Sequence, residues 1–158
     1  MLFLKKNWVS FLFFATLVFA VYFNALGNNF VSDDLTSIVT NPSLSRPELF
    51  LRFPYFVISP VLVLYYFINQ IFGLSPLFYR LINVLAHTCV VFLIYVILRR
   101  LNTFAVALFV ATVFAFHPIL TESVAWISGV TYSHSGFFIM KALLFYLSGK
   151  NYKSLFFF

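Results

Sequence analysis

Apolar runs long enough to cross a bilayer constrain this chain more than any other feature of its sequence. The first run extends from Trp8 to Leu26. At about 1.5 Å per residue, a helix over this run spans roughly 28 Å, close to the ~30 Å hydrocarbon core of a bilayer. A cleaved signal peptide is the alternative, but its apolar core is about 7–15 residues long and is followed by a small-residue cleavage site. We therefore expect a retained membrane-spanning helix at about 8–26.

The composition agrees with a bilayer environment. Hydrophobic residues make up 63% and charged residues 9% of the 158 residues, whereas soluble domains average about 25% charged residues. The mean hydropathy is +1.00. We therefore expect an all-α integral membrane protein with a single membrane domain over residues 1–158. A nucleic-acid partner is excluded, because no basic cluster exceeds two adjacent residues.

Three further apolar segments are expected to span the membrane, at about 77–98, 101–117 and 130–148. The segment from Tyr55 to Phe72 is also apolar, but a Ser-Pro step interrupts it. A spanning helix tolerates a proline, so this segment is either a further span or an interfacial or re-entrant helix. We prefer a membrane-surface helix within an outer loop over residues 27–76.

The placement of basic residues favours the surface helix. If Tyr55–Phe72 does not cross, three basic pairs fall on one side of the membrane: Lys5/Lys6, Arg99/Arg100 and Lys150/Lys153. The positive-inside rule assigns that side to the cytoplasm. We therefore expect four spans, a multi-pass protein of the cytoplasmic (inner) membrane, and both termini in the cytoplasm.

The four acidic residues and one histidine then lie on the non-cytoplasmic side. They are Asp33, Asp34, Glu48, Glu122 and His117. A carboxylate near a low-dielectric surface serves as a general base, or shares a divalent cation with a second carboxylate, here Asp34 with Glu122. A histidine relays a proton or binds a phosphate or a metal.

Each of these groups also has a structural explanation. Asp33-Asp34 before Leu35 is typical of a cap on a short helix. His117 precedes a proline and so ends a helix, and Glu122 either caps the next helix or lies solvated in a loop. Spacing alone leaves both explanations open.

Arginines in the same region suit an anionic head group, because the planar guanidinium matches a phosphate. The candidates are Arg46, Arg52 and Arg80, although Arg80 equally suits an anchor at the end of its helix. Arg80, Asn83 and His87 follow a spacing of three and four, so they share one helix face. We expect that face to point into protein, where Asn83 and His87 hydrogen-bond between helices.

Four motifs in a fixed order carry a family resemblance. They are residues 30–34 (FVSDD), 72–83 (FGLSPLFYRLIN), 114–118 (FAFHP) and 122–129 (ESVAWISG). Their order resembles the N-terminal part of polytopic glycosyltransferases of the type C fold. The branch related to protein O-mannosyltransferases, which often carries tetratricopeptide repeats, looks most similar. The resemblance covers about residues 8–147.

The resemblance implies a partial type C fold and a sugar transferase with a polyprenyl-phosphate donor. The acceptor would lie on the non-cytoplasmic face, with Asp33 or Asp34 as the catalytic base or as the group that orients the acceptor. His117 and Glu122 would join the same cavity. As a weaker implication, Arg80, Arg52 and Arg46 would bind the donor phosphate.

Two departures from the family pattern matter. Residues 130–133 (VTYS) stand where the family often has a charged residue after the Trp-Ile-Ser-Gly motif. Family members also have more spans and a donor-binding part further along, so we expect a fragment of a longer enzyme that needs its C-terminal half or other membrane subunits. The alternative is a non-enzymatic small membrane scaffold or assembly subunit, or an inactive truncated fragment. A transporter is less favoured, because the acids lie in loops and not at the bilayer midplane.

Overall fold

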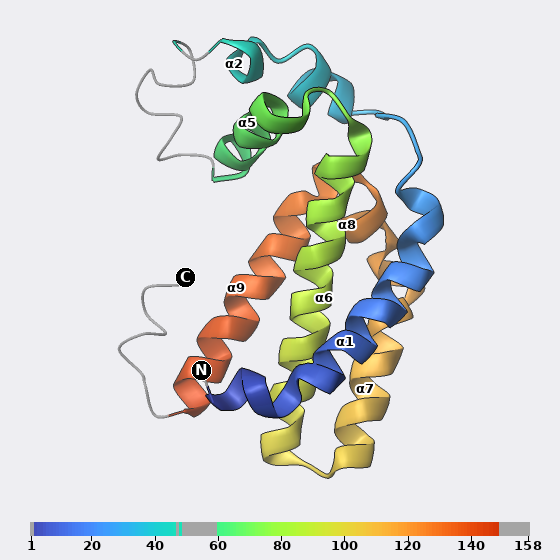
Figure 1. The fold of residues 1–158 in the computed structure, drawn as a ribbon, viewed down its shortest axis with the longest axis vertical. Helices are drawn as coiled ribbons and strands as arrows, with labels where there is room; N and C mark the ends of the chain where they lie inside the picture. The colour runs from blue at the N-terminus through green and yellow to red at the C-terminus, as the bar shows by residue number, and fades with distance from the viewer. Residues whose placement is uncertain (1, 47, 49–59, 149–158) are drawn as a thin grey trace.

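The computed structural model describes residues 2–46, 48 and 60–148, and within these ranges the chain is helical, with no residue in a β-strand. This confirms the expected all-α class. Four helices form a bundle, run side by side and alternate in direction along the chain (Figure 1). They are α1 (Leu2–Tyr22), α6 (Pro76–Leu101), α7 (Phe104–Phe116) and α9 (Val130–Leu147). The central helix is α6, which packs against the other three.

The other described elements gather toward the end of the bundle where α6 begins (Figure 1). They are η1 (Phe23–Ala25), η2 (Leu35–Val39), α2 (Pro42–Ser45), α5 (Pro60–Phe72), η3 (Pro118–Leu120), α8 (Thr121–Ala125) and η4 (Ile127–Gly129). At this end α5 lies beside α2 and contacts the start of α6. Residues 55–59 of the apolar run that contains α5 lie outside the described residues.

The turn between α6 and α7 follows from local sequence. Pro76 lies in the first turn of α6, where its missing N–H removes no helical bond. Asn102 is extended and ends α6, and Thr103 caps α7 by accepting a hydrogen bond from the Val106 amide at 3.4 Å. Leu101 is the last residue of α6, so α7 covers Phe104–Phe116 of the expected span at about 101–117, and the bounds of that span in the membrane stay a prediction.

Two described helical stretches are long and apolar enough to cross a membrane, Asn7–Ala25 and Pro76–Leu101. A third crossing results if Phe104–Phe116 and Pro118–Ala125, which are bent by 51° at their junction, form one span. The expected span 130–148 coincides with helix α9, which is not among these candidates. The chain is therefore a membrane-associated helical protein, and the number of four spans stays a prediction.

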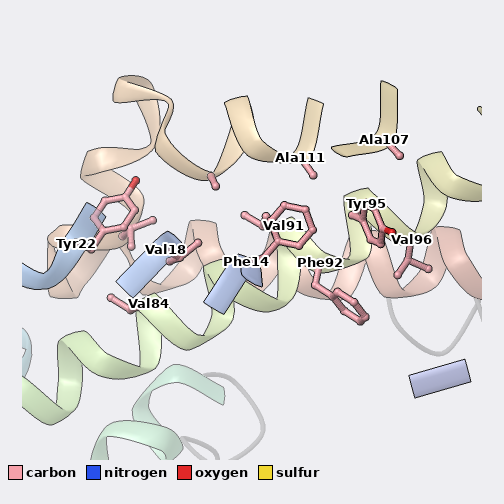
Figure 2. Packing of buried hydrophobic residues seen from close by; sticks show 12 residues of the cluster. Phe14, Val18, Tyr22, Val84, Val91, Phe92, Tyr95, Val96, Ala107 and Ala111 are labelled. Carbon is pink, nitrogen blue, oxygen red and sulfur yellow. The ribbon is translucent and has the colours of Figure 1, made fainter. Parts of the chain in front are cut away.

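The main core lies where α1, α6 and α7 meet (Figure 2). Phe14 and Val18 of α1 are fully buried there, beside Val91 of α6. The facing side of α7 carries alanines at every fourth position: Ala107, Ala111 and Ala115, each 0% exposed. Small side chains at this spacing allow two helices to approach closely, and van der Waals contact between such faces drives helix association in lipid.

A second core joins the short elements to the bundle. Ile38, Leu44, Tyr65, Ile68, Tyr79, Ile127 and Val130 are buried in it. The side-chain amides of Asn69 and Gln70 on α5 both donate to the Leu44 carbonyl, at 2.8 and 3.1 Å. These contacts attach α5 and α2 to each other above the first turns of α6.

The opposite end of the bundle carries Arg99 and Arg100, in the last turn of α6. The Arg100 guanidinium donates to the Ser148 hydroxyl at 2.6 Å, so the end of α9 lies beside it. Lys150 and Lys153 lie outside the described residues. The arrangement separates this basic end of the molecule from the end where the short elements gather.

Candidate functional site

The two adjacent aspartates lie in opposite environments. Asp34 is 0% exposed, whereas Asp33 is exposed. The Oδ1 atom of Asp34 accepts hydrogen bonds from the Ser128 hydroxyl at 2.6 Å and the Ser128 amide at 3.0 Å. Its Oδ2 atom accepts from the Val31 amide at 3.1 Å. Asp34 therefore ties the first acidic segment to the second polar segment, 94 residues further along the chain.

The capping explanation does not hold for Asp34. Although Asp34 immediately precedes η2, its side chain makes no capping bond to that helix, because both oxygens point to Val31 and Ser128. The Asp34 amide donates to the Val31 carbonyl at 3.0 Å, so residues 31–34 form a tight turn. Ser32 within it has a φ of 50°, an unfavourable left-handed conformation for a serine. Asp33 is presented outward on this turn.

Every residue from Ala125 to Ser128 is held by a side chain from another element. Arg80 donates from Nε to the Ala125 carbonyl at 2.7 Å. Asn83 donates to the carbonyls of Trp126 and Ile127, at 2.9 and 3.2 Å. The Tyr65 hydroxyl also donates to the Ile127 carbonyl, at 2.9 Å. Together with the bonds from Ser128 to Asp34, these contacts position the backbone between α8 and α9.

Arg80 also holds the start of the first loop. Its Nη1 atom donates to the Asn28 carbonyl at 2.7 Å and its Nη2 atom to the Asn29 carbonyl at 3.1 Å. Arg80 is 1% exposed, and its charge interacts with the buried carboxylate of Asp34. Opposite charges that are both removed from water require such compensating contacts. We call the five side chains of Asp34, Tyr65, Arg80, Asn83 and Ser128 the interloop clamp.

The phenol of Tyr65 remains a hydrogen-bond donor at physiological pH. Burial raises the pKa of Tyr65 well above its usual value of 10.0, and the neighbouring Asp34 and Tyr79 raise it further. Deprotonation would place a second negative charge beside Asp34 in a site that excludes water. The bond from Tyr65 to the Ile127 carbonyl is therefore retained throughout the neutral range.

Both candidate side chains of the second polar segment, His117 and Glu122, are exposed. His117 is exposed and ends α7, and its Nδ1 atom accepts from the Ile119 amide at 3.3 Å, which caps η3. Glu122 is exposed in the first turn of α8. A Cβ atom on Gly129 would lie 2.5 Å from the Glu122 carbonyl oxygen, so only glycine fits where η4 folds back on α8.

The candidate arginines differ in their surroundings. Arg46 is exposed at the end of α2, whereas Arg80 is buried and donates to three carbonyls. Arg52 lies outside the described residues. Their assignment to a donor phosphate stays a prediction.

The expected face of α6 does point into protein. Asn83 reaches the segment between α8 and α9, and the Nε2 atom of His87 lies 3.2 Å from the Ala115 carbonyl on α7. The expected contact between helices is confirmed for His87, whereas Asn83 bonds the segment between α8 and α9. Sequence reasoning did not single out Tyr65 or Ser128, because a tyrosine in an apolar run and a serine in a loop carry no local signal of a distant partner.

Within residues 2–46, 48 and 60–148, no group of three or more His, Cys, Asp and Glu side chains lies close enough to hold a metal ion. Both oxygens of Asp34 are engaged by Val31 and Ser128. A divalent cation shared by Asp34 and Glu122 stays a prediction.

Three protein O-mannosyl-transferases are similar to most of the chain. F38B6.6 of Caenorhabditis elegans is 26% identical over 148 residues, covering 82% of this chain and 21% of the relative. Tmtc2 of Xenopus laevis is 33% identical over 144 residues, covering 80% of this chain and 17% of the relative. Tmtc1 of Drosophila melanogaster is 30% identical over 131 residues, covering 73% of this chain and 15% of the relative.

These similarities confirm the resemblance to the protein O-mannosyltransferase branch. The chain spans between 15% and 21% of the length of these relatives. No family model matches the chain, and no solved structure matches it.

Proposed function

We propose that this chain forms part of a membrane protein O-mannosyltransferase. It would take a mannosyl group from a polyprenyl-phosphate donor and transfer it to a hydroxyl acceptor on the non-cytoplasmic face. Similarity to three protein O-mannosyl-transferases over 73% to 82% of the chain supports this proposal. The observation that carries it is the bond from Ser128 to Asp34, at 2.6 Å, which brings the Asp33-Asp34 loop against the loop that follows Glu122.

The position of both loops supports an active site on the non-cytoplasmic face. They lie toward one end of the bundle, and Arg99 and Arg100 lie at the other (Figure 1). Under the positive-inside rule, the arginine end faces the cytoplasm. The two loops then meet the donor head group and the acceptor on the opposite side of the bilayer.

Asp33 is the catalytic base in this proposal, because its carboxylate is exposed while that of Asp34 is buried and hydrogen-bonded. Asp33 accepts the proton of the acceptor hydroxyl as the hydroxyl oxygen bonds to the anomeric carbon of the sugar. The bond from that carbon to the phosphate oxygen breaks, and polyprenyl phosphate leaves.

The other candidate groups would serve the donor and the acceptor. Glu122 and His117 assist through hydrogen bonds or a divalent cation. Arg46 and Arg52 would contact the donor phosphate, for which a guanidinium is suited. Arg80 would add its charge to the same region while its donors hold the two loops.

The Asp33→Asn variant tests this assignment. We expect it to lower kcat/KM for mannosyl transfer by roughly 10²–10⁴-fold, the usual contribution of a general base. Transfer from a polyprenyl-phosphate mannose to an acceptor peptide would be measured in membranes that contain this chain with any companion segment. Glu48→Gln is the matched control, because it removes an exposed carboxylate outside the turn at residues 31–34 and outside the segment that follows Glu122, and it should leave the rate unchanged.

Full transfer activity in Asp33→Asn would remove the base from this mechanism. If the chain is a non-enzymatic scaffold, we also expect full transfer activity in Asp33→Asn. We then expect Asp33→Asn and Glu48→Gln to support membrane assembly equally. Equal assembly with a lost rate in Asp33→Asn alone therefore favours the transferase.

A further inference from the structure

The neighbouring carboxylates of Asp33 and Asp34 have different surroundings in the first loop. Asp33 is exposed, and within the part of the chain that the structure describes its carboxylate accepts one hydrogen bond, a long contact of 3.4 Å from the Ser32 hydroxyl. Asp34 is fully buried and accepts three hydrogen bonds. A carboxylate with both oxygens engaged in a buried site is suited to hold structure, whereas an exposed one remains available to a substrate.

The turn that carries Asp33 depends on Asp34. Val31 and Asp34 bond reciprocally, from the Val31 amide to Asp34 Oδ2 at 3.1 Å and from the Asp34 amide to the Val31 carbonyl at 3.0 Å. Ser32 is held at a φ of 50° between them. A non-glycine residue in this conformation costs energy and persists only where surrounding contacts determine it. The carboxylate of Asp34 supplies those contacts.

Ser128 fixes the turn relative to the rest of the protein. It donates from its hydroxyl and its amide to the same oxygen of Asp34. Bonds to an ionised carboxylate are shorter and about twice as strong as neutral ones. Ser128 is itself held in place, because Arg80, Tyr65 and Asn83 bond the three carbonyls that precede it.

We propose that Asp34 and Ser128 are positioning residues, whose paired side chains hold Asp33 at the geometry needed to accept the proton of the acceptor hydroxyl. This inference rests on the proposed transferase function. Loss of the pair lets the turn at residues 31–34 relax and displaces Asp33. Such a displacement lowers the rate of the chemical step, because a misplacement of about 1 Å costs up to 10²-fold. Acceptor binding is affected less.

The first experiment measures kinetics in Ser128→Ala, with any companion segment present. We expect kcat to fall about 10- to 100-fold and KM to change by less than about twofold. Ser128→Thr keeps a hydroxyl and should restore most of the rate. The matched control is Ser133→Ala, because the buried Ser133 hydroxyl also makes a 2.6 Å bond, but to the Ser123 carbonyl and not to Asp34. A control that retains kcat shows that the loss in Ser128→Ala is not a general effect of removing a buried hydroxyl.

The second experiment needs no sugar transfer. In a Cys89→Ser background, Asp34→Cys is combined with Ser128→Cys, and a protease site is inserted at the exposed Asn102-Thr103 turn. After oxidation and cleavage, we expect the two fragments to remain joined until a reductant is added. Asp33→Cys combined with Ser128→Cys is the control, and its fragments should separate, because the Asp33 side chain is exposed whereas that of Asp34 bonds to Ser128.

The outcomes separate this inference from the function on which it rests. If the Asp34–Ser128 cysteine pair does not cross-link, or if Ser128→Ala keeps its kcat, the positioning role is overturned even where Asp33→Asn is inactive. If the pair cross-links and Ser128→Ala loses kcat at constant KM, the positioning role is supported. If Asp33→Asn remains fully active, the proposed base fails, and the positioning role that depends on it fails too.

Discussion

At the scale of the residue, the sequence neighbours Asp33 and Asp34 lie in different environments. Asp33 and Asp34 are chemically identical, yet one is exposed and the other is 0% exposed with its oxygens bonded to Val31 and Ser128. Asp34 is buried because its oxygens accept hydrogen bonds from Val31 and Ser128, whereas Asp33 lies on the outside of the turn at residues 31–34, in which Ser32 has a φ of 50°.

Gly129 is a second residue whose backbone surroundings decide what fits. A Cβ there would lie 2.5 Å from the Glu122 carbonyl oxygen and 3.0 Å from Ser123 Cα, both backbone atoms that cannot move aside cheaply. We expect Gly129→Ala to lower the free energy of unfolding by about 1–3 kcal/mol, as overpacking does. Thermal unfolding in detergent measures the change.

Gly136→Ala is the control for this prediction. A Cβ at Gly136 would meet only the Val90 side chain, at the ordinary contact distance of 3.6 Å. The two variants add the same methyl group, so equal stability of both would contradict the close approach of η4 to α8.

At the scale of the element, α7 is shaped by its three buried alanines. Ala107 and Ala111 face α1 and α6 (Figure 2), and Ala115 is buried in the same core. Phe109 of the same helix is 70% exposed. An element with small residues inside and large apolar residues outside is typical of a helix that packs against protein on one side and lipid on the other.

Ala111→Leu tests this arrangement of α7. Because Ala111 is fully buried between helices, we expect the larger side chain to force α6 and α7 apart and to destabilise the protein by about 1–3 kcal/mol. Phe109→Leu changes the exposed face and should leave the melting temperature nearly unchanged. A melting temperature lowered equally by both variants would mean that the exposed face is also packed.

At the scale of the whole molecule, the central question is which ends of the helices share a side of the membrane. The structure joins the loops of Asp34 and Ser128 directly and separates them from Arg99 and Arg100. Four crossings with α5 on the surface place all of the basic pairs on the cytoplasmic side.

Cysteine accessibility measures this topology. In a Cys89→Ser background, single variants Ser32→Cys, Thr121→Cys and Asn102→Cys would be labelled in intact cells with a membrane-impermeant thiol reagent; all three native side chains are exposed. We expect label at positions 32 and 121 and none at 102 until the membrane is permeabilised. Label at 102 in intact cells would reverse the orientation, and the proposed acceptor side with it.

The sequence by itself determined the class of the molecule and the positions of its long helices. Apolar runs of bilayer length need backbone bonds satisfied within each segment, so helices at about 8–26, 77–98 and 130–148 were predictable from composition and spacing. The polar face of α6 was predictable too, because Asn83 and His87 recur at helical spacing and a polar face avoids lipid.

Only the tertiary structure decided how the two acidic segments meet. The partner of Asp34 is Ser128, 94 residues away, and Arg80 joins carbonyls of residues 28 and 125, which no local pattern relates. Hydrogen bonds between distant segments depend on how the helices pack, and packing depends on all of the apolar faces together. For that reason the chain alone could not separate Asp33 from Asp34, whereas the fold buries one and exposes the other.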